Sequence, residues 1–292
     1  MNATLELTNL AAEPCDEWQR MLRFVALDKN DRAAMVRTVE TLLERSKELV
    51  VNSYDYLLSV PETAAILGWE QGIDEEHLEE RRRFFTIWLT RTLGLDTSDE
   101  FAEYLFRAGQ IHAGHGPRHI HTPCAYVTTS VALVQASFSR YLGEAQFPGD
   151  IIAQAMSGWA KYLSIQLNQM LMGYQIAQEF EDGEYEIQFK TFGLLRPIVG
   201  KNELIIHADK GAQSGDLLRK FFNYYPQARS EALVKNWDSD DREDSLWVEI
   251  NPVYIPRQGW RFLLNGRDLD YAGGFDATVE DKDQISIFPM GR

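Results

Sequence analysis

The sequence predicts a multidomain protein in which an all-α half is followed by an α+β half. The chain has 292 residues, more than one typical domain needs to bury a core. From residue 17 to residue 180, apolar residues recur with a period of about 3.6, which is typical of amphipathic helices. After the acidic stretch 179–184 the period changes to two, which is typical of half-buried strands. We therefore expect an N-terminal extension, a helical domain, a linker and a second domain, over residues 1–16, 17–178, 179–184 and 185–292.

The charge and the cysteine content limit the partners and the compartment. The formal net charge of −15 argues against nucleic acids and anionic membranes as partners, because binding to phosphate groups requires a basic surface. The two cysteines, Cys15 and Cys124, form no CxxC pair, so we expect no disulfide framework and a reducing cytoplasm. The first residues lack a basic region followed by an apolar run, and no apolar run reaches the ~18 residues of a membrane span.

Five long helices are predicted in the first half. The first begins at a capping signal formed by Asn30 and Asp31, and its pattern continues until Pro61. The fifth keeps apolar residues at three- or four-residue steps over six turns, which is longer than one small core requires. The last two helices therefore either pair with a second subunit to form a homodimer or pack within one subunit. The expected ranges are 31–60, 74–93, 98–113, 123–142 and 151–174.

The second half is predicted to contain strands and one helix. Period-two segments separated by turn residues indicate the strands, and a helical segment that ends at Pro226 lies between them. The acidic stretch 237–243 is expected to be a mobile insertion. The expected elements are strands 185–192 and 203–208, helix 214–226, and strands 260–267 and 284–289.

His112 is the most informative single residue, because it lies where the third helix meets a glycine-rich break. It continues the apolar stripe formed by Phe101, Tyr104, Leu105, Ala108 and Ile111. An imidazole that faces inward needs a partner. The position is consistent with a core histidine that is hydrogen-bonded through its ring nitrogens, and also with an axial ligand of a metal or haem.

A zinc site is a further interpretation of the same region. His112, His115, His119, His121 and Cys124 lie within thirteen residues and are all zinc ligand types. Their spacing matches no known zinc module, and the Gly116–Pro117 pair already explains the local break in the helix.

The first half resembles the globin domains of bacterial globin-coupled sensors and the related protoglobins. Residues 107–116 resemble the family's signature around its proximal histidine, with Gly109, His112 and Gly116 in place. Residues 52–62 resemble the family's distal segment, with Tyr54 at the position of the distal tyrosine. Residues 98–101 resemble the start of the helix that carries the proximal histidine. The resemblance implies a globin fold that binds haem b, iron protoporphyrin IX, with His112 as the iron ligand.

The resemblance also implies which residues line the haem. Tyr54 would donate a hydrogen bond to an iron-bound gas, although without the resemblance it would be taken as a core tyrosine. An ungapped alignment backward from His112 places Arg81 and Phe84 on the distal side, with Phe85 and Trp88 one turn away. Phe84 would crowd the sixth coordination position, and Arg81 would either pair with a haem propionate or be solvated. The chain departs from the family pattern at Ser53, His121 and Thr122.

The second half resembles the MoaD/ThiS family of ubiquitin-like β-grasp sulfur carriers. Residues 189–200 resemble its first strand and turn, residues 264–268 its Asn-Gly strand end, and residues 272–289 its last segment. In that family, the carboxylate of a C-terminal Gly-Gly is converted to a thiocarboxylate. This chain ends in Pro-Met-Gly-Arg, so the terminal pair is missing. The resemblance therefore implies a binding or signalling module that uses the same fold.

Together these observations predict a cytoplasmic, non-enzymatic sensor of oxygen, or of another diatomic gas such as CO or NO. The globin domain would signal to the ubiquitin-like module, which would act on an unidentified protein partner. No nucleophile with a matching base and no phosphate-binding glycine loop is visible. Two alternatives stay open: a sulfur carrier under globin control after removal of Arg292, and a haem-free helical protein with a histidine-rich zinc site.

Overall fold

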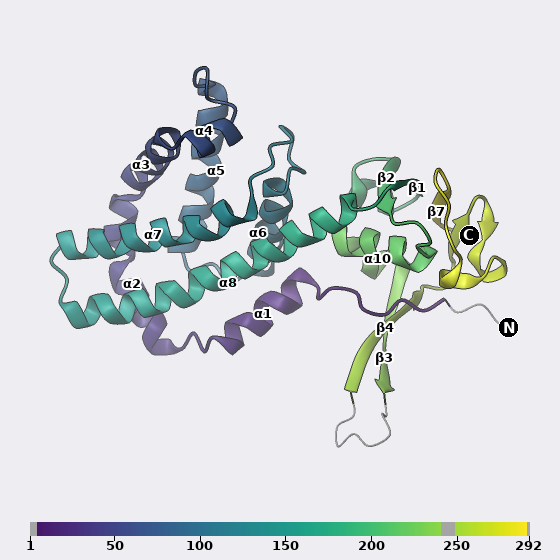
Figure 1. Cartoon of the computed structure of the whole chain (residues 1–292). Helices are drawn as coiled ribbons and strands as arrows, with labels where there is room; N and C mark the ends of the chain where they lie inside the picture. The colour runs from purple at the N-terminus through teal and green to yellow at the C-terminus, as the bar shows by residue number, and fades with distance from the viewer. Residues whose placement is uncertain (1–4, 241–248, 291–292) are drawn as a thin grey trace. The chain divides into compact units, whose positions relative to one another are not determined.

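The computed structural model describes residues 5–240 and 249–290, without the side chains of residues 239, 240 and 249. The chain folds into two compact units. One unit is helical and comprises Pro14–Gln175, and the other combines Met1–Glu13 with Ile176–Arg292 (Figure 1). The N-terminal segment thus belongs to the same unit as the C-terminal half of the chain.

Eight helices, the last of which continues beyond the unit, make up the described part of the helical unit. They are α1 (Pro14–Phe24), α2 (Lys29–Glu44), α3 (Ser46–Ser59), α4 (Pro61–Ile66), α5 (Glu75–Leu93), α6 (Asp99–His112), α7 (Cys124–Glu144) and α8 (Gly149–Glu181). This architecture confirms the predicted all-α first half. Helix α8 is longer than predicted, because it continues through residues 179–181 of the expected linker.

The start and the extent of the first predicted helix were wrong. Asp28, not Asn30 or Asp31, caps α2: its carboxylate accepts hydrogen bonds from the backbone N–H groups of Asn30 and Asp31, at 2.7 and 2.8 Å. The Asp31 side chain completes the capping box. The expected single helix is also divided into α2 and α3 at Arg45, where the backbone has φ −93° and ψ 1°. No glycine or proline marks this division in the sequence.

The caps of α5 and α6 match the predictions to within one residue. The Asp74 carboxylate accepts a hydrogen bond from the N–H of His77 at 3.0 Å, and the Ser98 hydroxyl accepts one from the N–H of Phe101 at 3.3 Å. These caps fix the rotational phase of both helices, and they place His112 at the last position of α6.

The core of the helical unit is aromatic. Trp18 of α1 packs edge-on against Phe101 and Tyr162, with ring centroids 5.9 and 6.2 Å apart. The Trp159 indole N–H donates to the Thr38 hydroxyl at 3.0 Å, so this buried ring has its polar group paired. Helix α1 is thus part of the core, although its first residues lie in the predicted N-terminal extension.

Helices α6 and α8 cross in direct backbone contact. A Cβ atom placed on Gly109 of α6 would lie 2.8 Å from the carbonyl carbon of Met170. A Cβ atom placed on Gly173 of α8 would lie 2.9 Å from the carbonyl carbon of Phe106. Only glycine allows this approach, because any side chain would overlap the opposing backbone.

The second unit has the β-grasp fold that was predicted. A helix packs on a five-stranded mixed sheet of order β2-β1-β7-β5-β6, in which β1 pairs antiparallel with β2 and parallel with β7. Phe221 of the helix stacks on Phe189 of β1, with ring centroids 5.4 Å apart. Its elements are β1 (Tyr185–Thr191), α9 (Leu195–Val199), β2 (Glu203–Ala208), α10 (Ser214–Tyr224), α11 (Gln227–Ala232), β3 (Leu233–Asp240), β4 (Glu249–Pro256), β5 (Trp260–Leu264), β6 (Arg267–Asp268), two 3₁₀ turns (Leu269–Tyr271 and Gly274–Asp276) and β7 (Gln284–Pro289).

A β-hairpin takes the place of the described part of the predicted mobile insertion, residues 237–240. Strand β3 pairs antiparallel with β4, with Trp237 opposite Pro252, so residues 237–240 are in a strand and the prediction was wrong for them. Residues 241–243 lie outside the described residues. The period-two signal was missed because the side chains of residues 234–238 are all exposed, which leaves no alternation of polar and apolar faces.

The N-terminal segment is built into the second unit. Leu7 is fully buried and exchanges two backbone hydrogen bonds with Tyr254 of β4, at 2.8 and 2.9 Å. Further along, the N–H of Ala11 donates to the Asn223 side-chain oxygen at 3.0 Å, and the carbonyl of Ala11 accepts from Arg229 at 2.7 Å. Residues 5–11 are therefore held at both ends of the segment.

Met290, the residue after β7, is bonded to the connection between β4 and β5 and to β5 itself. The N–H of Met290 donates to the carbonyl of Gly259, and its sulfur lies 3.3 Å from Nε of Arg261. Gly291 and Arg292, on which the sulfur-carrier alternative depends, lie outside the described residues. None of the described helices has both the length and the hydrophobicity needed for a membrane span.

Candidate functional site

Five of the six predicted haem-lining residues gather from three helices. They are Tyr54 of α3, Arg81, Phe85 and Trp88 of α5, and His112 of α6. The three α5 residues follow one another at i, i+4 and i+7, so they share one face of the helix. The Phe85 ring meets Tyr54 edge-on at 6.2 Å and lies 5.4 Å from Trp88, and the Arg81 charge acts on both Tyr54 and His112.

The His112 ring has one nitrogen bound and one with its lone pair free. Nδ1 lies 2.7 Å from the carbonyl oxygen of Ala108, and since that oxygen only accepts, Nδ1 carries the proton. Nε2 has no hydrogen-bond partner within residues 5–240 and 249–290. Burial, reinforced by the positive charge of Arg81, lowers the pKa of the imidazole, although the bond to Ala108 opposes this. His112 is therefore neutral at pH 7, with the tautomer that a metal ligand needs.

Tyr54 supplies a protonated phenol. Burial raises the pKa of Tyr54 to about 12, although the nearby charges of Arg81 and Arg82 act in the opposite direction. The hydroxyl therefore keeps its proton, and its ability to donate a hydrogen bond, across the physiological pH range. Tyr104 of α6 also lies near enough to affect the ionisation of Tyr54.

Arg81 is held by a buried histidine that sequence reasoning did not identify. Its Nε–H donates to Nε2 of His77 at 2.9 Å. His77 is 3% exposed and packs against Trp69, with ring centroids 5.0 Å apart. Burial lowers the pKa of His77, so it stays a neutral acceptor. His77 precedes Arg81 by one helical turn, and that spacing is the signal that sequence reasoning could have used.

Gln166 of α8 is a second residue that sequence reasoning missed. Its side-chain oxygen accepts hydrogen bonds from the Trp88 indole at 2.8 Å and from the Thr92 hydroxyl at 3.1 Å. Gln166 is 1% exposed, and these bonds fix the orientation of the Trp88 ring. A polar residue within the apolar segment of the fifth predicted helix was the available signal.

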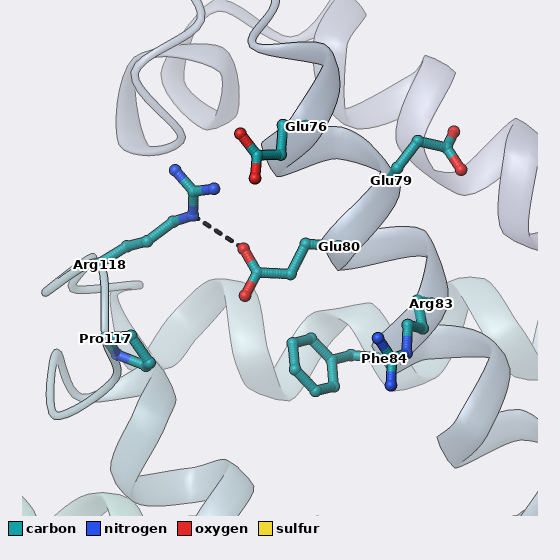
Figure 2. A pocket seen from close by; sticks show the side chains of 7 residues that line it. All are labelled: Glu76, Glu79, Glu80, Arg83, Phe84, Pro117 and Arg118. Atoms are coloured by element: carbon teal, nitrogen blue, oxygen red, sulfur yellow. Dashed lines mark hydrogen bonds and ion pairs between the residues drawn. The ribbon is translucent and has the colours of Figure 1, made fainter.

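Phe84 lies on another face of α5. It is 50% exposed and borders an open cavity of about 730 Å³. Figure 2 shows its ring pointing from α5 toward the loop of Pro117 and Arg118, where Arg118 pairs with Glu80 at 2.8 Å. The other residues that line this cavity are Glu76, Glu79 and Arg83. The structure thus does not bring Phe84 into the cluster around Tyr54 and His112.

The histidine-rich loop does not form a metal centre. Over residues 5–240 and 249–290, no three His, Cys, Asp or Glu side chains are placed to hold a metal ion. His121 instead lies with Nε2 2.9 Å from the hydroxyl oxygen of Tyr174 on α8. The zinc alternative therefore receives no support from the structure.

The donor set fits a haem group. A neutral imidazole with a free Nε2 lone pair suits haem iron, and the flat rings of Phe85 and Trp88 suit the faces of a porphyrin. The protonated phenol of Tyr54 adds a hydrogen-bond donor to the same group of residues.

Comparison with known proteins identifies the family of the helical half. A family model described as Protoglobin matches residues 15–180. The globin domain of the Geobacter sulfurreducens globin-coupled sensor is 20% identical, with 54% of this chain and 97% of that chain covered and a TM-score of 0.44. No curated protein matches the chain.

Two archaeal structures match a smaller part of the chain. Small archaeal modifier protein 1 from Methanosarcina acetivorans is 24% identical, with 36% of this chain and 93% of that chain covered and a TM-score of 0.28. The protein of the same name from Haloferax volcanii is 19% identical, with 36% and 96% covered and a TM-score of 0.26.

Proposed function

Because the chain belongs to the protoglobin family, whose model matches more than half of its 292 residues, we propose that it binds haem b and senses oxygen or another diatomic gas. The observation that carries this proposal is the His112 ring, whose Nε2 lone pair is free and whose pKa, like that of Tyr54, is affected by the charge of Arg81. When bound, haem supplies an iron atom that takes up oxygen, CO or NO reversibly.

Each residue of the cluster is assigned a separate role in binding haem or the gas. His112 would hold the iron, and the bond from Nδ1–H to Ala108 sets the plane of its ring and increases its basicity. Tyr54 would supply a hydrogen-bond donor to the gas, since its phenol keeps its proton. Phe85 and Trp88 would exclude water from the haem, and Gln166 holds the Trp88 ring by a hydrogen bond.

The contact between α6 and α8 supports a route for the signal. His112 is the last residue of α6, and Gly109 joins that helix to the α8 backbone. Helices packed backbone to backbone, without intervening side chains, do not deform continuously, so a shift of α6 would displace α8. Helix α8 continues to Glu181, four residues before β1. The β-grasp unit would then be the output module, recognised by a protein partner.

The remaining parts of the proposal concern assembly and location. Leu133 of α7 is 42% exposed, and an apolar side chain on that helix supports a homodimer through α7 and α8. We place the protein in the cytoplasm, where Cys15 and Cys124 would stay reduced, and assign it no enzymatic activity.

The decisive experiment is an absorption spectrum of the purified, haem-supplemented protein with and without reductant, oxygen and CO. We expect an intense Soret band that shifts with each gas. His112→Ala is expected to weaken haem binding by more than about a hundredfold, because the ligand itself is lost. The control is His119→Asn, in the exposed loop after α6, where asparagine tolerates the left-handed backbone of φ 51°. A wild-type protein without a Soret band, or an unchanged spectrum in His112→Ala, contradicts the proposal.

Tyr54→Phe tests the role of the phenol. Loss of one hydrogen bond of about 1 kcal/mol makes oxygen dissociate about fivefold faster, while CO, a weaker acceptor, is less affected. Stopped-flow measurement of both dissociation rates checks this. Tyr56→Phe is the control, because Tyr56 is on the same helix and 52% exposed. Equal oxygen dissociation rates in the two variants would show that Tyr54 does not contact the gas.

A further inference from the structure

Arg81 carries a positive charge that no carboxylate of the described residues contacts, and Glu80 acts on it only at longer range. Within residues 5–240 and 249–290 it makes no ion pair. The neighbouring acids are already engaged: Glu79 pairs with Arg82 at 2.9 Å, and Glu80 pairs with Arg118 at 2.8 Å. A mostly buried arginine is rarely left in this state, because transfer of an unpaired charge out of water is costly.

The guanidinium group is held with its outer donors free. His77 takes only the Nε–H, so the two Nη groups keep four N–H donors, which have no hydrogen-bond partner in the described part of the chain. His77 is itself fixed, because it is buried against Trp69 and its N–H is bound by Asp74. The group therefore does not need to be ordered before it binds a ligand.

The free donors belong to the same cluster as the candidate haem ligand. Arg81 shares its α5 face with Phe85 and Trp88, and its charge acts on both Tyr54 and His112. We infer that Arg81 binds an anionic group beside this cluster, a carboxylate or a small inorganic anion, through its two Nη groups. This inference rests on the proposed function, since the anion is either a carboxylate side chain of the haem or a free anion beside Tyr54.

Arg81→Met removes the charge at similar size, and Arg83→Met is the matched control. Arg83 is on the same helix, but it is exposed and borders the open cavity. If the anion is free, azide binding to the ferric holoprotein weakens about tenfold or more in Arg81→Met, while binding of neutral imidazole does not change. If the anion belongs to the haem, Arg81→Met loses haem faster, but it loses haem dimethyl ester, which lacks the carboxylates, at the wild-type rate. Equal behaviour of the two variants in both assays overturns the inference.

A protein that binds no haem would remove the proposed function, and the anion site would still be tested without the cofactor. Acetate at constant ionic strength is expected to raise the thermal midpoint of the apoprotein in the wild type and in Arg83→Met. It is not expected to raise it in Arg81→Met. The same response to acetate in all three apoproteins overturns the anion site independently of haem.

Discussion

Gly109→Val is expected to destabilise the helical unit by about 3 kcal/mol or more, because the added side chain would occupy space held by the α8 backbone. The first added atom would lie 2.8 Å from the carbonyl carbon of Met170 and 2.9 Å from the amide nitrogen of Tyr174. Neither neighbour is a flexible side-chain end, so the two helices would have to separate. Urea unfolding followed by circular dichroism measures the loss.

Two further variants identify the cause of that loss. Gly143→Val makes the same chemical change inside α7, where no atom lies within 4 Å of the added Cβ, and is expected to change stability by less than about 1 kcal/mol. Gly173→Val meets the backbone of Phe106 from the other helix and is expected to reproduce the large loss. A Gly109→Val protein as stable as Gly143→Val would show that α6 and α8 do not touch there, and would remove the proposed route of the signal.

The position of His112 could be predicted from the sequence, but the crossing that supports it could not. Ser98 and the apolar stripe after it define α6, so His112 at its end follows from local signals. Gly109 has no local signal that names its partner. Gly173 lies 64 residues further along the chain (173 − 109 = 64) and is its counterpart only in the folded structure.

The predicted haem-lining residues of α5 show the limit of an alignment without gaps. It selected Arg81 and Phe84 together, yet one residue corresponds to about 100° of helix rotation. Phe85 therefore contacts Tyr54, while Phe84 borders the open cavity. His77 and Gln166 were missed for a different reason. A sequence shows that a polar residue lies within an apolar segment, but it does not show which distant group it binds.

In the second unit, the hydrophobic pattern predicted the strands that are half-buried. It did not predict the elements whose pairing depends on distant segments of the chain. Strands β1 and β7 have alternating or continuous apolar residues, and both were predicted. The β3–β4 hairpin and the segment around Leu7 were not, because Leu7 pairs with Tyr254 across almost the whole chain. No sequence period records such a pairing. Arg229 binds the same segment further along, at the carbonyl of Ala11.

Arg229→Met is expected to cost about 3 kcal/mol or more and to release the N-terminal segment. Arg229 is 2% exposed and donates to acceptors that include the carbonyl of Phe222 at 2.9 Å, the carbonyl of Ala11 at 2.7 Å and the side-chain oxygen of Asn223 at 2.9 Å. Methionine fills similar space but donates nothing, and a buried acceptor left without a partner costs about 1–3 kcal/mol.

Urea unfolding and hydrogen exchange of the full chain measure the two effects of Arg229→Met separately. Exchange at the Leu7 amide is expected to accelerate together with the loss of stability, because Ala11 and Leu7 belong to one bound segment. Arg257→Met is the control, since Arg257 makes an exposed bond to the carbonyl of Ser230 in the same unit. Stability lost with unchanged Leu7 exchange would mean that the pairing with Tyr254 holds the segment without Arg229. Faster exchange at Leu7 without a loss of stability would mean that Arg229 orders the N-terminal segment but does not stabilise the β-grasp core.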